Sequence, residues 1–200
     1  MKLYIARHGQ DTDNEQGILN GHRDTDLTQK GQAQAQALAE GIQKLGLHFD
    51  AVYVSPLKRA FQTAQVVSQL NGFPDPIPLP DLIERDFGHL TGRPTSEIIT
   101  LPAKDLIHTE KIIYFMRGEW IETFSEAEER AKRVLKKITD DHKGETILLV
   151  THGDIGKALY AQYYHLSIES VIHQFYFGNS DLLELTPESG ADSAHLIHIE

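Results

Sequence analysis

Two apolar runs in this chain end in the same dipeptide. Residues 2–6 lead into Arg7-His8-Gly9, and residues 146–150 lead into Thr151-His152-Gly153. A third run, residues 51–54, leads into a Ser-Pro-Leu-Lys-Arg loop that ends at Arg59. Each run has the length and composition of a buried strand. If the three strands are parallel neighbours, their carboxyl ends deliver Arg7, His8, Arg59 and His152 to one crevice, where open α/β sheets bind ligands.

The segments between these runs have helical patterns. Thr28 is a typical N-cap for a helix that ends near Gly46, and a second helix begins after Pro56 and ends near Asn71-Gly72. We also expect helices over residues 125–141 and 154–164, and short strands near residues 171–177, 181–185 and 195–199. This alternation predicts an α/β fold with a mainly parallel sheet. Residues 73–120 are proline-rich and lack periodicity, so we expect them to form an excursion that covers the crevice.

Composition limits the classes of partner. Two hundred residues suffice for one compact domain over residues 1–200, and no second domain is required. A net charge of -10 spread along the chain argues against a nucleic-acid-binding face and an anionic membrane surface. The absence of cysteine excludes disulfides, thiolate metal sites and a cysteine nucleophile. No secretory or membrane-spanning segment is recognisable, so we expect a cytoplasmic protein.

The residue types in the crevice favour a phosphate group. The planar fork of an arginine matches two phosphoryl oxygens, and Arg7 and Arg59 are suited to that task. A neutral imidazole can attack phosphorus if an acceptor orients its other ring N–H. A backbone carbonyl in the turn at Gly9 could be that acceptor, and Gly9 would also allow the backbone to approach a ligand closely.

A single His-Gly dipeptide would indicate only a turn, but the joint occurrence after buried strands favours a site. We expect the other nine histidines to be surface or packing residues. His195 and His198 are three residues apart, which on a strand places the rings on opposite faces, so no metal site is predicted there.

Four ordered motifs together resemble the histidine phosphatase superfamily, which has the phosphoglycerate mutase-like fold. They are Arg7-His8-Gly9 with Asn14, residues 20–33, residues 55–64, and Thr151-His152-Gly153. The resemblance spans nearly the whole chain. It implies a three-layer α/β/α sandwich, a phosphohistidine intermediate, and no metal or cofactor.

The resemblance also implies roles for individual residues. His8 would be the nucleophile, and Arg7, Arg59 and His152 would bind the phosphoryl group and stabilise its charge. Residues 82–92 resemble the block that supplies the family's general acid, and Glu84 is the matching carboxylate. The matching substrate-binding positions are Asn14, Asn20, Gly21 and Gly153.

Several positions depart from the family pattern. Asp11 replaces the usual threonine, which places a negative charge near an anion site or directs it away. Leu90 and Thr91 replace a tryptophan and a glutamate, and the Asn-Lys that follows this block in mutases is absent. These departures leave the catalytic groups in place but obscure the substrate.

We therefore predict a phosphatase that hydrolyses small phosphomonoesters, with a small phosphorylated metabolite as its partner. Phosphoglycerate mutase is the alternative within the family, and a non-catalytic domain that binds a phosphorylated ligand is an alternative of another class. The specificity determinants are expected within residues 93–120, where the side chains that could meet a distal charge on the substrate are Lys104, His108, Lys111 and Arg117.

Overall fold

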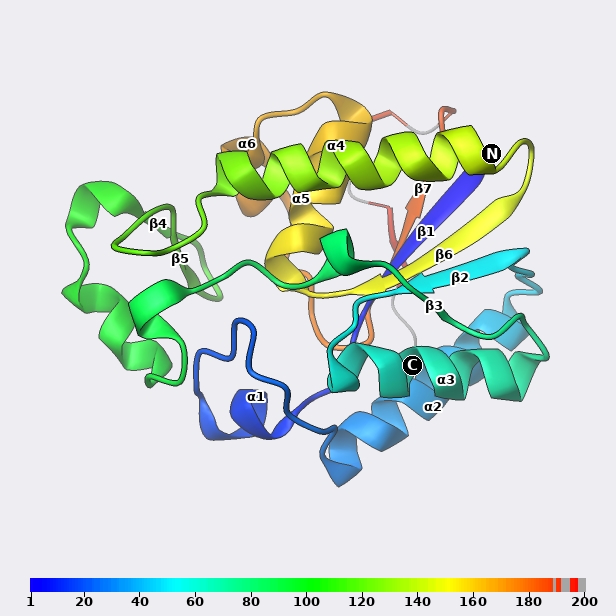
Figure 1. The fold of residues 1–200 in the computed structure, drawn as a ribbon, viewed down its shortest axis with the longest axis horizontal. Coiled ribbons are helices and arrows are strands. Elements are labelled where there is room, and N and C mark those ends of the chain that lie inside the picture. Colours follow the sequence, from blue (N-terminus) through cyan, green and yellow to red (C-terminus); the bar gives the residue numbers. More distant parts are fainter. Residues whose placement is uncertain (189, 192–194, 198–200) are drawn as a thin grey trace.

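The computed structural model describes residues 1–188, 190–191 and 195–197, and its centre is a six-stranded sheet (Figure 1). The sheet has the order β3-β2-β6-β1-β7-β8, and its strands are β1 (Lys2–Arg7), β2 (Ala51–Val54), β3 (Ile77–Pro78), β6 (Thr146–Thr151), β7 (Leu182–Leu185) and β8 (Leu196–Ile197). The first four strands of that order are parallel, whereas β7 is antiparallel to β1 and β8. Strand β6 lies between β1 and β2, so the three strands expected from the apolar runs are neighbours.

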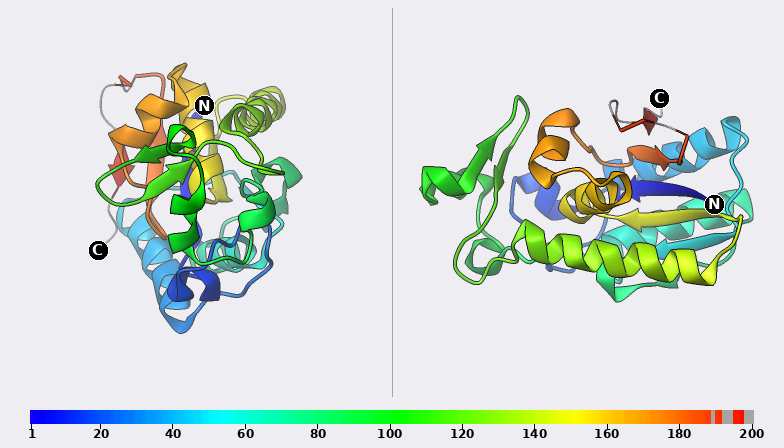
Figure 2. Two further views of the ribbon diagram at one scale, coloured as in Figure 1. Left: turned by 90° about the vertical axis from the view of Figure 1, so that its left-hand side faces the viewer. Right: turned by 90° about the horizontal axis from the view of Figure 1, so that it is seen from above.

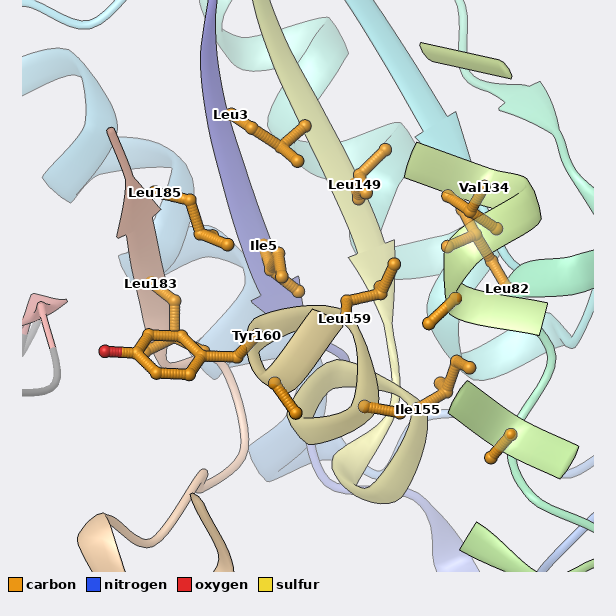
Figure 3. Packing of buried hydrophobic residues seen from close by; sticks show 14 of the residues in the cluster. Leu3, Ile5, Leu82, Val134, Leu149, Ile155, Leu159, Tyr160, Leu183 and Leu185 are labelled. Atoms are coloured by element: carbon orange, nitrogen blue, oxygen red, sulfur yellow. The ribbon is translucent and has the colours of Figure 1, made fainter. Parts of the chain in front are cut away.

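Helices cover both faces of the sheet (Figures 1 and 2). One layer contains α4 (Phe124–Asp141), α5 (Gly153–Tyr164) and α6 (Ile168–Gln174), and the other contains α2 (Gln29–Lys44) and α3 (Lys58–Asn71). Strand β1 shows why both layers form: Leu3 and Ile5 pack toward α5, and Tyr4 and Ala6 pack toward α2 and α3 (Figure 3). Because side chains alternate along a strand, an all-apolar run can pack against a helix layer on each face of the sheet. The predicted three-layer α/β/α class is confirmed.

Local capping sets the helix ends close to where the sequence predicts them. The Thr28 hydroxyl accepts a hydrogen bond from Gly31 N at 3.0 Å and begins α2. Gly72, with φ of +67°, ends α3 in the left-handed conformation that glycine adopts without strain. Thr123 and Glu126 form a capping box at the start of α4.

One predicted strand is wrong. A strand is predicted near residues 171–177, but Ile168–Gln174 is the helix α6. The Ser167 hydroxyl accepts from Ser170 N at 3.2 Å and caps it, and Ile168, Val171 and Ile172 bury one helical face. The cap and the packing outweigh the strand propensity of these residues.

The excursion after α3 is mostly irregular and stands at one end of the molecule, where the strands end (Figure 2). It first returns to the sheet edge as β3 and then forms four short 3₁₀ helices and a hairpin. These are η1 (Pro80–Leu82), η2 (Gly88–Leu90), η3 (Thr95–Thr100), η4 (Ala103–Asp105), β4 (Leu106–His108) and β5 (Ile113–Phe115). A small apolar cluster of its own, which includes Phe87, Ile98 and Phe115, packs it against Leu19 beyond the short helix α1 (Thr12–Gln16). Within the described residues, no helix combines the length and apolarity needed to span a bilayer.

Candidate active site

The carboxyl ends of the central strands bring His8, Arg59 and His152 into contact. His8 follows β1, His152 follows β6, and Arg59 lies in the first turn of α3 beyond β2. The Arg59 Nε atom lies 3.2 Å from His8 Nε2 and 3.2 Å from His152 Nδ1, and the centroids of the two imidazole rings are 5.0 Å apart. All three side chains are almost wholly buried.

The contacts of His8 fix its tautomer. Its Nδ1 lies 2.6 Å from the Gly9 carbonyl oxygen, which can only accept, so Nδ1 carries the hydrogen. Its Nε2 faces the Arg59 Nε–H and therefore presents a lone pair. Burial, and then the charges of Arg59 and Arg7, hold the pKa of His8 well below its usual range. His8 is thus a neutral imidazole whose lone pair is on Nε2 and accepts from the Arg59 Nε–H.

The Gly9 carbonyl is the orienting acceptor that the turn was expected to supply. Gly9 also meets a neighbouring segment closely: a Cβ at Gly9 would lie 2.4 Å from the Gly31 carbonyl oxygen. Glycine is required because the backbones of the β1 turn and α2 touch there.

His152 presents its other nitrogen to the site. Its Nε2 lies 2.7 Å from Ser55 Oγ, while Nδ1 faces Arg59. Burial, and then the charge of Arg59, hold the pKa of His152 well below its usual range. His152 is thus a neutral imidazole whose Nδ1 accepts from the Arg59 Nε–H and whose Nε2 faces Ser55.

Arg59 is held more tightly than the sequence suggested. Its Nη1 donates to the Arg23 carbonyl at 2.6 Å and its Nη2 to the Gly21 carbonyl at 2.9 Å, so the fork faces the protein and the Nε edge faces the histidines. Asp11 does not point away: its Oδ2 lies 3.2 Å from Arg59 Nε, and both side chains are fully buried. Asp11 also accepts from Asn20 Nδ2 at 2.8 Å and from Asn14 N at 2.7 Å.

Arg7 has donor capacity left for a ligand. Its Nη1 donates to the Phe177 carbonyl at 2.5 Å, but its buried Nε has no partner. Buried polar groups are nearly always satisfied, so an unpaired guanidinium N–H that faces a cavity indicates a place for an anion.

Glu84 lies against the N-terminus of α5. Its Oε1 accepts from Arg85 N at 2.9 Å and from Ile155 N at 3.2 Å. Burial, and then the neighbouring Asp154 carboxylate, raise the pKa of Glu84, although the Arg85 hydrogen bond and the charges of Arg59 and Arg7 oppose the shift. A carboxyl group that keeps its proton to higher pH is suited to act as a general acid.

A cavity of about 460 Å³ opens beside these groups. Arg7, Asn14, Asn20, Glu84 and Gly153 line it, whereas Gly21 and the buried side chains of His8, Arg59 and His152 do not. Gly21 instead acts through its carbonyl oxygen, which holds Arg59. A side chain at Gly153 would come within 3.7 Å of both Arg7 and Glu84 and would occupy the cavity between them.

Four further residues support the site. Ser55 orients His152. Thr63 Oγ1 accepts from Gly9 N at 3.1 Å and donates to the Arg59 carbonyl at 2.8 Å. Asn179 Nδ2 donates to the His8 carbonyl at 3.0 Å and to Asn14 Oδ1 at 3.1 Å. Arg85 Nε donates to Asp154 at 2.9 Å. Ser55 and Thr63 lie within the motif at residues 55–64, but no sequence signal pointed to Asn179.

The remaining histidines stay apart from this centre, except that His22 Nε2 lies 2.7 Å from the Glu84 carbonyl oxygen. His195 contacts the Gly190 carbonyl at 3.2 Å, and His198 lies outside the described residues. Among the residues that the structure describes, no group of three histidine or carboxylate side chains is arranged to hold a metal ion.

Comparisons with known proteins agree with this geometry. The family model of the histidine phosphatase superfamily (branch 1) matches residues 3–199. A metal-independent phosphoserine phosphatase of Arabidopsis thaliana is 33% identical over 162 residues, which cover 80% of this chain and 67% of that protein. A 2,3-bisphosphoglycerate-dependent phosphoglycerate mutase of Bartonella bacilliformis is 30% identical over 176 residues, which cover 86% and 85% of the two chains.

Among solved structures, the alpha-ribazole phosphatase from Shigella flexneri matches with a TM-score of 0.78 and 26% identity, over 100% of this chain and 96% of that chain. The relatives thus include both hydrolases and mutases. The side chains that line the cavity therefore bear on which substrate this chain accepts.

Proposed function

Because this chain belongs to branch 1 of the histidine phosphatase superfamily, we propose that it is a metal-independent phosphatase that hydrolyses small phosphomonoesters through a phosphohistidine on His8. The observation that carries the proposal is the state of His8: the imidazole is neutral, its Nδ1–H is held by the Gly9 carbonyl, and its Nε2 lone pair faces Arg59.

The proposed reaction has two steps. The His8 Nε2 lone pair attacks phosphorus, the bond between phosphorus and the ester oxygen breaks, and the departing oxygen takes the proton of Glu84. The ring then carries a positive charge that the Gly9 carbonyl stabilises through Nδ1–H. Water next attacks the phosphohistidine, Glu84 takes a proton from that water, and the P–N bond breaks to release phosphate and neutral His8.

Hydrolysis is favoured over phosphoryl transfer between carbons of phosphoglycerate by the charges that line the cavity. A mutase must rebind a substrate that carries both a phosphate and a carboxylate. Three basic side chains line this cavity, Arg7, Arg85 and Lys111, and Arg85 is already bonded to Asp154. Two acidic side chains, Glu84 and Asp154, line the same cavity and lower its net positive charge.

Trapping the intermediate tests this function. After millisecond mixing with ³²P-labelled phenyl phosphate in excess chelator, the chain is quenched into alkaline detergent, because the P–N bond is acid-labile. We expect label on the peptide that contains His8 and continuous release of inorganic phosphate. Interconversion of 2- and 3-phosphoglycerate that outpaces phosphate release would instead make the chain a mutase. Ligand binding without label or release would make it a non-catalytic binder.

The pH dependence tests the role of Glu84. Activity requires His8 to be neutral and Glu84 to be protonated. Since the pKa of His8 is lowered, the acidic limb of kcat/KM should lie below pH 6.5, and since the pKa of Glu84 is raised, the alkaline limb should lie above pH 4.5. We expect Glu84→Gln to lower kcat/KM for alkyl phosphates by about 10²-fold or more and to abolish the alkaline limb while the acidic limb stays.

The control for this variant is Glu40→Gln, the same substitution at an exposed position of α2, which should leave the profile unchanged. With 4-nitrophenyl phosphate the loss in Glu84→Gln should be smaller, because that leaving group needs no proton. An alkaline limb that persists in Glu84→Gln would show that another group is the acid.

A further inference from the structure

The cavity beside His8 has two chemically different ends. Its inner end is polar, with Arg7, Asn14, Glu84 and Gly153. Its outer end is formed by η3, the β4–β5 hairpin and the segment before β7. The apolar side chains on these segments are Ile98, Ile99, Ile112, Ile113, Phe115 and Phe177 together with Tyr114 and Tyr176, beside the polar Thr95, Ser96 and Lys111. Ile18, Leu19 and Phe87 extend the apolar lining from neighbouring loops. A phosphate bound at the inner end would direct the rest of its ester toward this apolar wall.

The rim of the cavity exposes apolar side chains to water. Ile99 is 65% exposed, Ile112 is 39% exposed and Tyr176 is 37% exposed. They come from three separate segments but meet around one opening. Seven large hydrophobic residues are exposed in the part of the chain that the structure describes, and three of them lie on this rim. Apolar surface gathered in this way marks a place where an apolar ligand is covered.

Partners for a second anionic group are scarce in the cavity. The Arg85 guanidinium donates to Asp154, to the Glu122 carbonyl at 2.9 Å and to the Phe115 carbonyl at 2.8 Å. Lys111 lies at the rim with its Nζ 5.4 Å from the centroid of the Tyr176 ring. The Asp154 carboxylate adds a negative charge to the lining.

The other candidates for a distal charge do not reach this cavity. Arg117 donates to Asp105 at 2.6 Å. His108 lines a neighbouring groove between the hairpin and α6, and Lys104 does not line the cavity. Of the four side chains that the sequence suggested, only Lys111 is on the substrate's path.

We propose that the natural substrate is a monophosphate ester of a bulky apolar alcohol, alkyl or aryl, that has no second anionic group. This inference rests on the proposed phosphatase function and specifies its substrate. The phosphate binds at Arg7 and His8, and the apolar body displaces water from the wall of η3 and the hairpin. A phosphoglycerate would bring its carboxylate against isoleucine and phenylalanine side chains, where it would lose hydration and where, among the described lining residues, Lys111 at the rim is the cation left to pair with it.

Alkyl phosphates of different length test this inference, because their leaving groups have nearly the same basicity. We expect kcat/KM to rise about 10- to 100-fold from ethyl phosphate to hexyl phosphate, since each fully buried methylene contributes about a factor of four and these are partly buried. The matched anion is 6-phosphonooxyhexanoate, which has the same chain with a terminal carboxylate. Its kcat/KM should be at least about tenfold below that of hexyl phosphate.

A double variant tests whether the preference for longer alkyl chains depends on the apolar rim. Ile99→Ser with Ile112→Ser should lower the hexyl-to-ethyl ratio of kcat/KM by about fivefold or more. The control is Leu45→Ser with Leu70→Ser, which changes two similarly exposed side chains, one just after α2 and one on α3, that do not line the cavity, and should leave both rates unchanged.

The outcomes separate the two proposals. Equal rates for ethyl and hexyl phosphate, or faster hydrolysis of the carboxylate ester or of 3-phosphoglycerate, would overturn the substrate class while leaving the phosphatase function intact. If no ester is hydrolysed, the phosphatase function fails, and equilibrium binding then decides the inference. Tighter binding of hexyl than of ethyl phosphate would support the apolar site, and equal binding would overturn it.

Discussion

Replacing His8 by asparagine is expected to lower kcat/KM for phosphomonoesters by at least about 10⁴-fold, because the nucleophile takes part in both steps. Asparagine keeps a polar side chain of similar reach, and its amide N–H can still donate to the Gly9 carbonyl that now holds His8 Nδ1. The variant should therefore fold and keep the cavity. Inorganic phosphate release in excess chelator measures the loss, and thermal unfolding checks the fold.

His48→Asn is the matched control. His48 is exposed, and its ring lies 5.5 Å from that of Phe73, outside the site. It should keep full activity. If His8→Asn retained more than about one hundredth of the native rate, direct attack by water would replace the phosphohistidine route.

Replacing Arg59 by methionine should damage stability and activity together. Arg59 and Asp11 form a fully buried ion pair, and removal of one partner leaves a buried charge uncompensated. We expect the free energy of unfolding to fall by about 3–5 kcal/mol. We also expect kcat/KM to fall by about 10²- to 10³-fold, because Arg59 faces the two histidines between which the phosphoryl charge would be stabilised. Urea unfolding and phosphate release measure the two effects.

The double variant Arg59→Met with Asp11→Asn separates these effects. Removal of the stranded carboxylate should recover about 1–3 kcal/mol of stability, while activity should stay as low as in Arg59→Met. Arg133→Met provides the comparison, since Arg133 pairs with Asp81 at the surface, where water screens the pair, and its loss should leave stability almost unchanged. A recovery of activity in the double variant would mean that Asp11, rather than the loss of Arg59, blocks phosphate binding.

The sequence predicts the central strands and most helices because local signals and packing agree there. Apolar runs such as residues 146–150 suit a strand buried on both faces, and Thr28 and Gly72 occupy helix ends that their side chains or backbone favour. The same agreement brings Arg7, His8, Arg59 and His152 together, because parallel strands place their carboxyl ends at one edge.

The features that the sequence does not predict depend on contacts between distant segments. The orientation of Asp11 toward Arg59, and of the Arg59 fork toward the carbonyls of Gly21 and Arg23, follows from how two loops meet. Asn179 reaches the His8 loop across 171 positions of sequence. The excursion has few regular elements, so no periodicity could show which of its side chains line the cavity. Helix α6 was missed because its cap and buried face outweigh residue preference.

The position of β1 in the sheet determines when the site can exist during synthesis. The strand that carries Arg7 and His8 is made before the other strands of the sheet, but it pairs with β6 at residues 146–151 and with β7 at residues 182–185. At a synthesis rate of about 5–20 residues per second, ~7–30 s separate the appearance of His8 from that of His152. Until then β1 lacks the two strands that flank it. His8 also lacks the cluster that it forms with Arg59 and His152 in the folded chain. We therefore expect the nascent chain to be inert toward phosphate esters until residues 146–185 have left the ribosome.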